Sequence, residues 1–139
     1  MEIRESEQRF LLLQKFLKEN ALGDFQVTPL ADDCSFRRYF RVKANAVSFV
    51  VMDAPPEKED TRPFIAISKL LNGYGFSAPR VFKVDRLNGF LILEDFGNET
   101  YTKALSEDKD ELCLYHLAID LLINLGHRNY KEEIKFLPK

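Results

Sequence analysis

The sequence predicts an α+β fold, built on a five-stranded antiparallel sheet with one helix inserted between the third and fourth strands. Strand-like segments fill residues 25–53 and 80–94, and a helical pattern separates them. Further helical patterns precede and follow this region. The 139 residues, of which 45% are hydrophobic, are enough for one domain with a buried core.

A helix is expected over residues 5–20, because Phe10, Leu13 and Leu17 recur at helical spacing. Gly23 follows shortly after as a stop. One side of this helix is therefore apolar and should pack against the rest of the domain.

Residues 25–53 predict three consecutive strands. Apolar and polar side chains alternate over residues 36–42, as they do in a half-buried strand. Residues 46–52 form a nearly continuous apolar run, which is typical of a strand covered on both faces. The first turn between these strands is expected at residues 31–35.

The inserted helix follows a break in the sheet pattern. Pro55-Pro56 ends the third strand, because proline cannot donate to a ladder. Asp60 or Thr61 is expected to cap the helix, which Gly73 ends. Asn88-Gly89 then predicts a two-residue hairpin turn between the fourth and fifth strands, with both residues at positive φ.

Strand signals stop after Phe96, which marks an expected lobe boundary. Asn98 is predicted to cap a short helix, and Asp108 or Asp110 to start a long one that ends at Gly126. The predicted order is helix, three strands, helix, two strands and helices.

The composition disfavours several classes of partner. The net charge is −2 and the pI is about 5.7, so no broad positive field attracts nucleic acid or an anionic membrane. The charged amino terminus does not look like a signal peptide, and no apolar run is long enough to span a membrane. We therefore expect a cytoplasmic protein. Cys34 and Cys113 are expected to be free thiols, because their spacing suits neither a disulfide framework nor zinc.

Three stretches carry a resemblance to a known family. They are Asp-Cys-Ser-Phe-Arg-Arg-Tyr-Phe-Arg-Val at 33–42, Val-Val-Met-Asp-Ala-Pro-Pro-Glu-Lys-Glu-Asp at 50–60 and Leu-Glu-Asp-Phe-Gly at 93–97. Together with the order of elements, they resemble the aminoglycoside phosphotransferase family, which has a protein-kinase-like fold. Within that family the sequence is most similar to bacterial kinases that phosphorylate the anomeric hydroxyl of N-acetylmuramate and N-acetylglucosamine.

The resemblance implies a nucleotide-binding small lobe over residues 1–96, followed by the hinge and first helices of an incomplete large lobe over 97–139. It implies ATP as the ligand, with Mg²⁺ expected only in an intact enzyme. Enzymes of this class carry catalytic and metal-binding carboxylates in the large lobe, often in a His-Gly-Asp motif, which these residues lack. No catalytic or metal-binding residue is assigned, and the chain alone is expected to transfer no phosphate.

The first hairpin of such a lobe usually lies over the phosphates of the nucleotide. Its turn here has no glycine, so Ser35 is either a substitute phosphate donor or an ordinary turn residue. The two-residue period of a strand puts Arg38 on the face of Phe36, which should look toward the nucleotide cleft or the core. Arg38 is the first candidate for bidentate phosphate binding. Arg37 and Arg41 are expected on the opposite, wet face, and Arg37 ranks second and Arg41 third as phosphate-binding candidates.

Asp53 stands where the third strand of protein kinases ends in a phosphate-pairing lysine. Its carboxylate is expected either to orient a phosphate-binding arginine or to cap the strand end. By resemblance, adenine would lie against Val42 and Val51, and backbone groups of residues 94–96 would bind it as the hinge.

Two polar patterns have alternative interpretations. Glu94 and Asp95 could suggest acid–base catalysis, but neighbours on a strand point to opposite faces, which favours the hinge role with Phe96. His116 and Asp120 lie on one helical face with Asn124, which indicates a solvated polar stripe more than a metal site.

The remaining expectation concerns residues 111–125, which are apolar around most of the helix. Such a helix predicts self-association or a partner, most simply a separately encoded catalytic lobe. The alternative function is a non-enzymatic interaction module, or pseudokinase fragment, that docks a partner through this helix. A third hypothesis, RNA binding through Arg37, Arg38, Tyr39 and Arg41, has less support, because a basic footprint should extend further.

Overall fold

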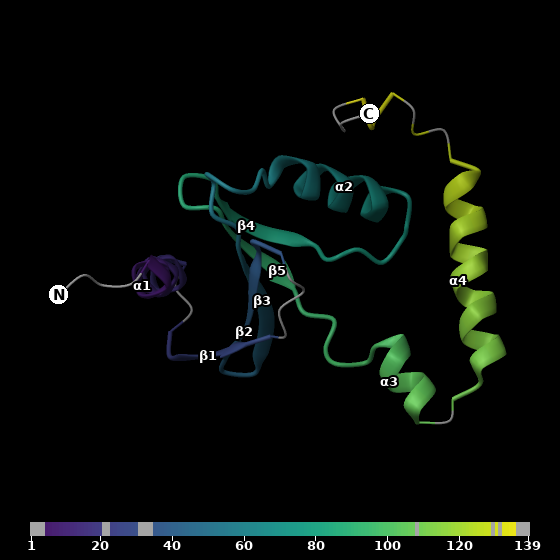
Figure 1. Ribbon diagram of the computed structural model, residues 1–139, viewed down its shortest axis with the longest axis horizontal. Helices are drawn as coiled ribbons and strands as arrows, with labels where there is room; N and C mark the ends of the chain where they lie inside the picture. The colour runs from purple at the N-terminus through teal and green to yellow at the C-terminus, as the bar shows by residue number, and fades with distance from the viewer. Residues whose placement is uncertain are drawn as a thin grey trace. The chain divides into compact units, whose positions relative to one another are not determined.

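The computed structural model describes residues 5–20, 23–30, 35–107, 109–128, 130 and 132–135. It confirms the predicted α+β fold and the predicted order of elements (Figure 1). The elements are α1 (Glu5–Glu19), β1 (Phe25–Pro29), β2 (Arg38–Ala44), β3 (Val47–Asp53), α2 (Arg62–Gly73), β4 (Val81–Asp85), β5 (Phe90–Glu94), α3 (Tyr101–Ser106) and α4 (Glu111–Gly126).

The five strands form one antiparallel sheet in the order β1-β2-β3-β5-β4. The β4–β5 hairpin therefore joins the sheet through β5, which pairs with β3. The α2 helix lies in the connection between β3 and β4, as the sequence predicts. This arrangement is that of a protein-kinase-like small lobe.

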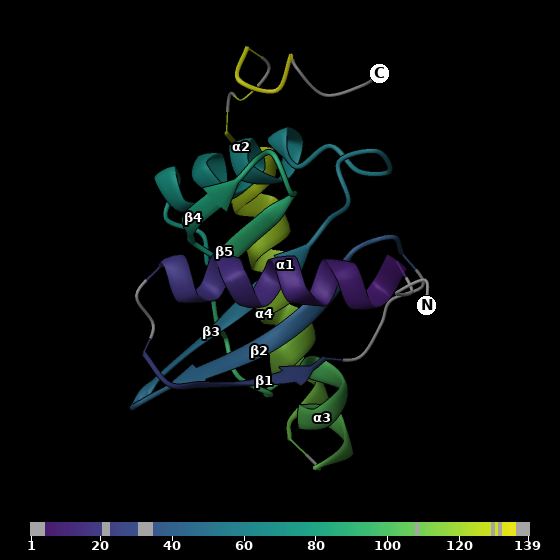
Figure 2. The same ribbon diagram turned by 90° about the vertical axis from the view of Figure 1, so that its left-hand side faces the viewer.

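The α1 helix covers one face of the sheet (Figure 2). Leu13, Phe16 and Leu17 are its buried residues, and they form a cluster with buried side chains from β2, β3 and β5. Phe16 and Phe90 stack with their ring centroids 5.7 Å apart. The apolar side predicted for this helix is thus the side that forms the core.

The opposite face carries a second cluster, which includes Met52, Leu91 and Leu93. Phe64 and Ile65 of α2 pack against it. Because neighbouring residues of a strand point to opposite faces, α1 and α2 bury alternate side chains of β3 and β5. The apolar run of β3 is explained by this burial on both faces.

The turn between β4 and β5 differs from the prediction. It spans residues 86–89, and of the expected pair only Gly89 has positive φ, at 74°. The two-residue turn is wrong because Asp85 organises a longer one: its carboxylate accepts hydrogen bonds from the backbone and side-chain amides of Asn88, at 3.1 and 2.7 Å. A Cβ at Gly89 would meet the carbonyl oxygen of Ala54 at 1.9 Å, so this position also needs glycine for space.

Helix starts agree with the prediction in part. Asp110 caps α4, and its carboxylate accepts from the amide of Cys113 at 3.1 Å. Thr100, not Asn98, caps α3, because its hydroxyl reaches the amide of Lys103 at 3.1 Å. The predicted turn at 31–35 lies outside the described residues except for its last residue.

The chain divides into two compact units, Met1–Asp95 and Phe96–Lys139. The first contains the sheet with α1 and α2, and the second contains α3 and α4. Within the second unit, exposed apolar side chains surround α4: Leu112, Tyr115, Leu117, Ile119, Leu121, Leu122 and Ile123. None of the helices in the described part of the chain is long and apolar enough to cross a membrane.

Candidate nucleotide-binding surface

The segment that precedes β2 lies beside the loop between β3 and α2. Phe36 is 63% exposed, and the ammonium group of Lys58 lies 5.8 Å from the centroid of its ring. The guanidinium of Arg37 is 4.0 Å from the carboxylate of Glu59. Ser35 forms a local turn, in which its hydroxyl accepts from the amide of Arg37 at 3.0 Å. The candidate phosphate residues therefore lie next to a charged loop.

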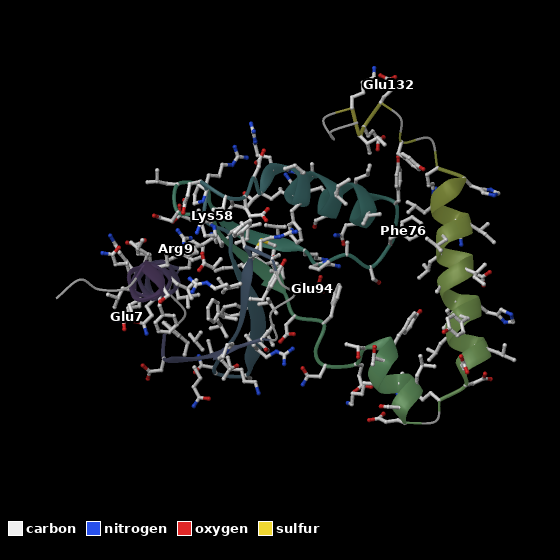
Figure 3. The ribbon with its side chains drawn as sticks, viewed as in Figure 1. Glu7, Arg9, Lys58, Phe76, Glu94 and Glu132 are labelled. Atoms are coloured by element: carbon white, nitrogen blue, oxygen red, sulfur yellow. The ribbon has the colours of Figure 1, made fainter. Side chains whose placement is uncertain are left out.

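Arg38 and Asp53 are cross-strand partners on β2 and β3. The Nε and Nη2 atoms of Arg38 donate to Asp53 Oδ2 at 3.1 and 2.5 Å. Arg9 of α1, labelled in Figure 3, donates through its own Nε and Nη2 atoms to Asp53 Oδ1, at 2.9 and 2.5 Å. Arg9 also donates to the carbonyl of Asn88 at 2.7 Å. The Asp53 side chain is only 1% exposed, so two guanidinium groups neutralise a buried carboxylate.

The contacts of Asp53 are with two arginine side chains, and the phosphate-binding role of Arg38 stays a prediction. The carboxylate orients Arg38 and, at the same time, ties the end of β3 to α1 through Arg9. Sequence reasoning missed Arg9. A signal was present, because Arg9 precedes Leu13 and Leu17 at intervals of four residues and so continues the buried side of α1. A charge in line with an apolar stripe indicates a buried partner.

Val42 and Val51 lie in the core beneath α1, and neither has any exposed surface. Contact between a ligand and either valine therefore requires α1 to leave this face. The opposite face of β2 and β3 carries Tyr39 and Val50, which are half-buried. The cleft role of the two valines stays a prediction.

In the middle of β2, Arg41 forms a second largely buried ion pair. Its Nε and Nη2 atoms donate to the two carboxylate oxygens of Asp95, at 2.7 and 2.9 Å. The hydroxyl of Ser48 donates to Asp95 Oδ2 at 2.5 Å. The side chains of Arg41 and Asp95 are only 14% and 6% exposed. Arg41 is thus largely withdrawn from solvent, which the alternation of β2 alone did not indicate.

Glu94, labelled in Figure 3, has partners different from those of Asp95. Its carboxylate accepts from the amide of Arg80 at 3.2 Å and lies 3.8 Å from the Arg80 guanidinium. Its own amide donates to the carbonyl of Arg80 at 2.9 Å. Phe96, the third predicted hinge residue, is 55% exposed.

An exposed ion pair marks the start of α2. The guanidinium of Arg62 donates to both carboxylate oxygens of Asp60, at 2.9 and 2.8 Å. The side-chain hydrogen bond from Arg62 lowers the pKa of Asp60 below its usual value. Because both groups are open to water, this pair serves as a reference for the buried ion pairs of Asp53 and Asp95.

The sheet, its inserted helix and the anchored segment after β5 define a small lobe of the kind found in kinase-like phosphotransferases. A model of the phosphotransferase enzyme family, APH, matches residues 26–122, and the chain belongs to this family. The predicted family resemblance is confirmed.

The chain is similar to curated N-acetylmuramate/N-acetylglucosamine kinases. It is 46% identical over 99 residues to that of Pseudomonas aeruginosa, a match that covers 70% of this chain and 29% of the relative. It is 40% identical over 114 residues to that of Pseudomonas putida, covering 80% and 33%. The match to the Caulobacter vibrioides kinase is 32% over 135 residues, covering 78% and 37%. The chain thus spans about a third of the length of these relatives.

Proposed function

We propose that this chain forms the ATP-binding part of an amino sugar kinase. The observation that carries the proposal is its identity to N-acetylmuramate/N-acetylglucosamine kinases over 70–80% of its length. The family match over residues 26–122 includes most of the sheet and the segment after β5. Family membership implies a nucleotide as the phosphate donor. The acceptor class, a cell-wall amino sugar, comes from the relatives.

The base of ATP is proposed to bind backbone groups of residues 94–96, and its phosphates to lie toward Ser35 and Arg38. Both places lie along β2: Arg41, beside Asp95, is the middle residue of the strand, and Arg38 is its first residue. A strand rises about 3.3 Å per residue, so these two arginines are separated by roughly 10 Å along the sheet. Because they are three positions apart on the strand, their side chains point to opposite faces of the sheet, and Arg38 alone of the two is proposed to contact the phosphates.

Arg38 suits a phosphate contact, although Asp53 already binds it. Its Nε and Nη2 face Asp53, while the side chain remains 32% exposed. A guanidinium has five donors, so the edge that Asp53 does not use is available to an anion. Asp53 neutralises the arginine only in part, because Arg9 shares the same carboxylate.

Phosphoryl transfer is proposed to need groups beyond these residues. ATP supplies the phosphoryl group, and Mg²⁺ would be held by carboxylates of a large lobe, as is usual in kinases. No His-Gly-Asp motif is present in the 139 residues. We therefore expect this chain to bind ATP and to show no turnover by itself.

The proposed partner is a polypeptide that corresponds to the other two-thirds of the relatives. Leu112 and Leu122 of α4 are 69% and 68% exposed, and apolar side chains are exposed around the rest of the helix. Exposed apolar area on this scale is typical of an interface. Leu122→Glu should abolish co-purification of such a polypeptide, while Leu11→Glu on α1, also at an exposed position, should not.

Isothermal titration of the chain with ATP, with and without Mg²⁺, tests nucleotide binding. We expect weak, saturable binding that Mg²⁺ changes and that Arg38→Ala reduces, because one lobe covers only one side of the ligand. Arg62→Ala is the matched control, since Arg62 is exposed and paired only at the start of α2. Absence of saturable binding at millimolar ATP would refute the proposal.

The second candidate function is a non-enzymatic interaction module, favoured by the exposed apolar side chains of α4. This function predicts the same effect of Leu122→Glu on a partner, but no response to ATP. Titration and co-purification together therefore separate the two candidates.

A further inference from the structure

The structure places one buried carboxylate at the point where the chain leaves the sheet. Asp95 is the first residue after β5 and the last residue of the first compact unit. Its side chain binds Arg41 from β2 and Ser48 from β3. Three segments that are separate in the sequence therefore meet at this carboxylate.

The ladder between β3 and β5 ends one residue earlier, at the pair of Phe49 and Glu94. Beyond that pair, the side chain of Asp95 holds this segment to β2 and β3. A bidentate guanidinium–carboxylate contact fixes orientation as well as distance, because two parallel hydrogen bonds must be satisfied together. The Asp95 side chain thus continues the alignment that the strand pairing provides up to Glu94.

The neighbouring ion pair is much less restrained. The guanidinium of Arg80 lies 3.8 Å from Glu94, and its side chain is 71% exposed. Exposed pairs of this kind contribute little order, because water competes for both groups. By contrast, the Asp95 side chain is 6% exposed. Asp95 is therefore the better candidate for setting the backbone geometry of this segment.

We infer that Asp95 is a positioning residue for nucleotide binding, with Arg41 and Ser48 as its supports. The inference rests on the proposed function, in which peptide groups of residues 94–96 bind the base. Asp95 acts through the backbone: its fixed side chain holds the adjoining peptide groups in a ready orientation, which lowers the ordering cost of binding. Its carboxylate is occupied by Arg41 and Ser48 and does not contact the nucleotide.

Amide hydrogen exchange and ATP titration of the full 139-residue chain test this inference. Ser48→Ala removes one hydrogen bond from an exposed residue and should leave the fold intact. Asp95→Asn removes the charge, and Arg41→Lys keeps the charge but not the bidentate contact. Asp60→Asn is the matched control, because it removes a carboxylate from an exposed arginine pair.

We expect faster exchange at the amides of Phe96 and Gly97 in Ser48→Ala and Asp95→Asn, with exchange in α2 and β4 unchanged. The dissociation constant for ATP should rise about three- to tenfold in Ser48→Ala and more in Asp95→Asn, as loss of one or more charge-assisted hydrogen bonds predicts. Arg41→Lys should give an intermediate effect. Asp60→Asn should change neither measurement.

Failure of the inference differs from failure of the proposed function. If the unmodified chain does not bind ATP, the proposed function fails and this inference falls with it. If the unmodified chain binds ATP, and Ser48→Ala and Asp95→Asn bind it equally well, only the inference is overturned. Unchanged exchange at Phe96 and Gly97, or an equal increase throughout the first unit, would also overturn it.

Discussion

Replacing Asp53 by asparagine tests the energetic role of the carboxylate between α1 and the sheet. The substitution preserves size and one acceptor oxygen but removes the negative charge. Arg9 and Arg38 then retain positive charges with no carboxylate between them. The unpaired charge of Arg9 is the more costly of the two, because its side chain is 13% exposed whereas that of Arg38 is 32% exposed.

Breaking a buried ion pair from one side costs about 3–5 kcal/mol of unfolding free energy. Partial access of both guanidinium groups to water reduces this cost, so we expect Asp53→Asn to lower the free energy of unfolding by about 2–4 kcal/mol. Domains of this kind are stable by roughly 5–15 kcal/mol in total. The loss should lower the Tm by roughly 10–20 °C for a unit of this size.

Urea unfolding followed by circular dichroism measures the loss, with Arg9→Met and Arg38→Met as companions. Each of these leaves Asp53 with one arginine, so each should cost less than Asp53→Asn, and Arg38→Met should cost least. Combining Arg9→Met with Asp53→Asn should cost less than the sum of the two. A loss below about 0.5 kcal/mol for Asp53→Asn would refute the reasoning, because that is the range of ordinary surface substitutions.

Three further predictions concern packing, backbone geometry and pH. Leu17→Ala, at a fully buried position in α1, should lower the free energy of unfolding by about 3 kcal/mol, whereas Leu11→Ala, at a 56% exposed position of the same helix, should change it by less than about 0.5 kcal/mol in urea unfolding. Gly89→Ala should cost more than the roughly 1–2 kcal/mol of positive φ alone, because the new Cβ would meet a backbone carbonyl oxygen; thermal unfolding checks this, and a smaller loss would contradict it. NMR titration should show the pKa of the Asp60 carboxyl below its usual value, and the pKa should return to that value in Arg62→Ala. Because the folded-state pKa is lowered, the contribution of this pair to stability is present above the unfolded pKa and is lost as pH falls through the folded pKa.

Local patterns in the sequence determined the order of elements. The period of α1, the alternation in residues 36–42 and the apolar run of β3 each follow from which side chains a helix or strand must bury. Caps were predictable in part: Asp110, one of two candidates for α4, acts within three residues, whereas the cap of α3 was expected at Asn98 and lies at Thr100. The β4–β5 turn was predicted wrongly, because the Asp85 side chain and close packing against Ala54 outweighed the preference of Asn-Gly.

Only the tertiary structure decided which charges meet. Asp53 lies 44 residues from Arg9 and 15 from Arg38, and Asp95 lies 54 residues from Arg41. Sequence periodicity assigns a side chain to a face of its own element, but it does not say which element covers that face. The placement of α1 over β2 and β3 therefore both buried Val42 and brought Arg9 to Asp53. Long-range ion pairs depend on the docking of whole elements, which no local pattern encodes.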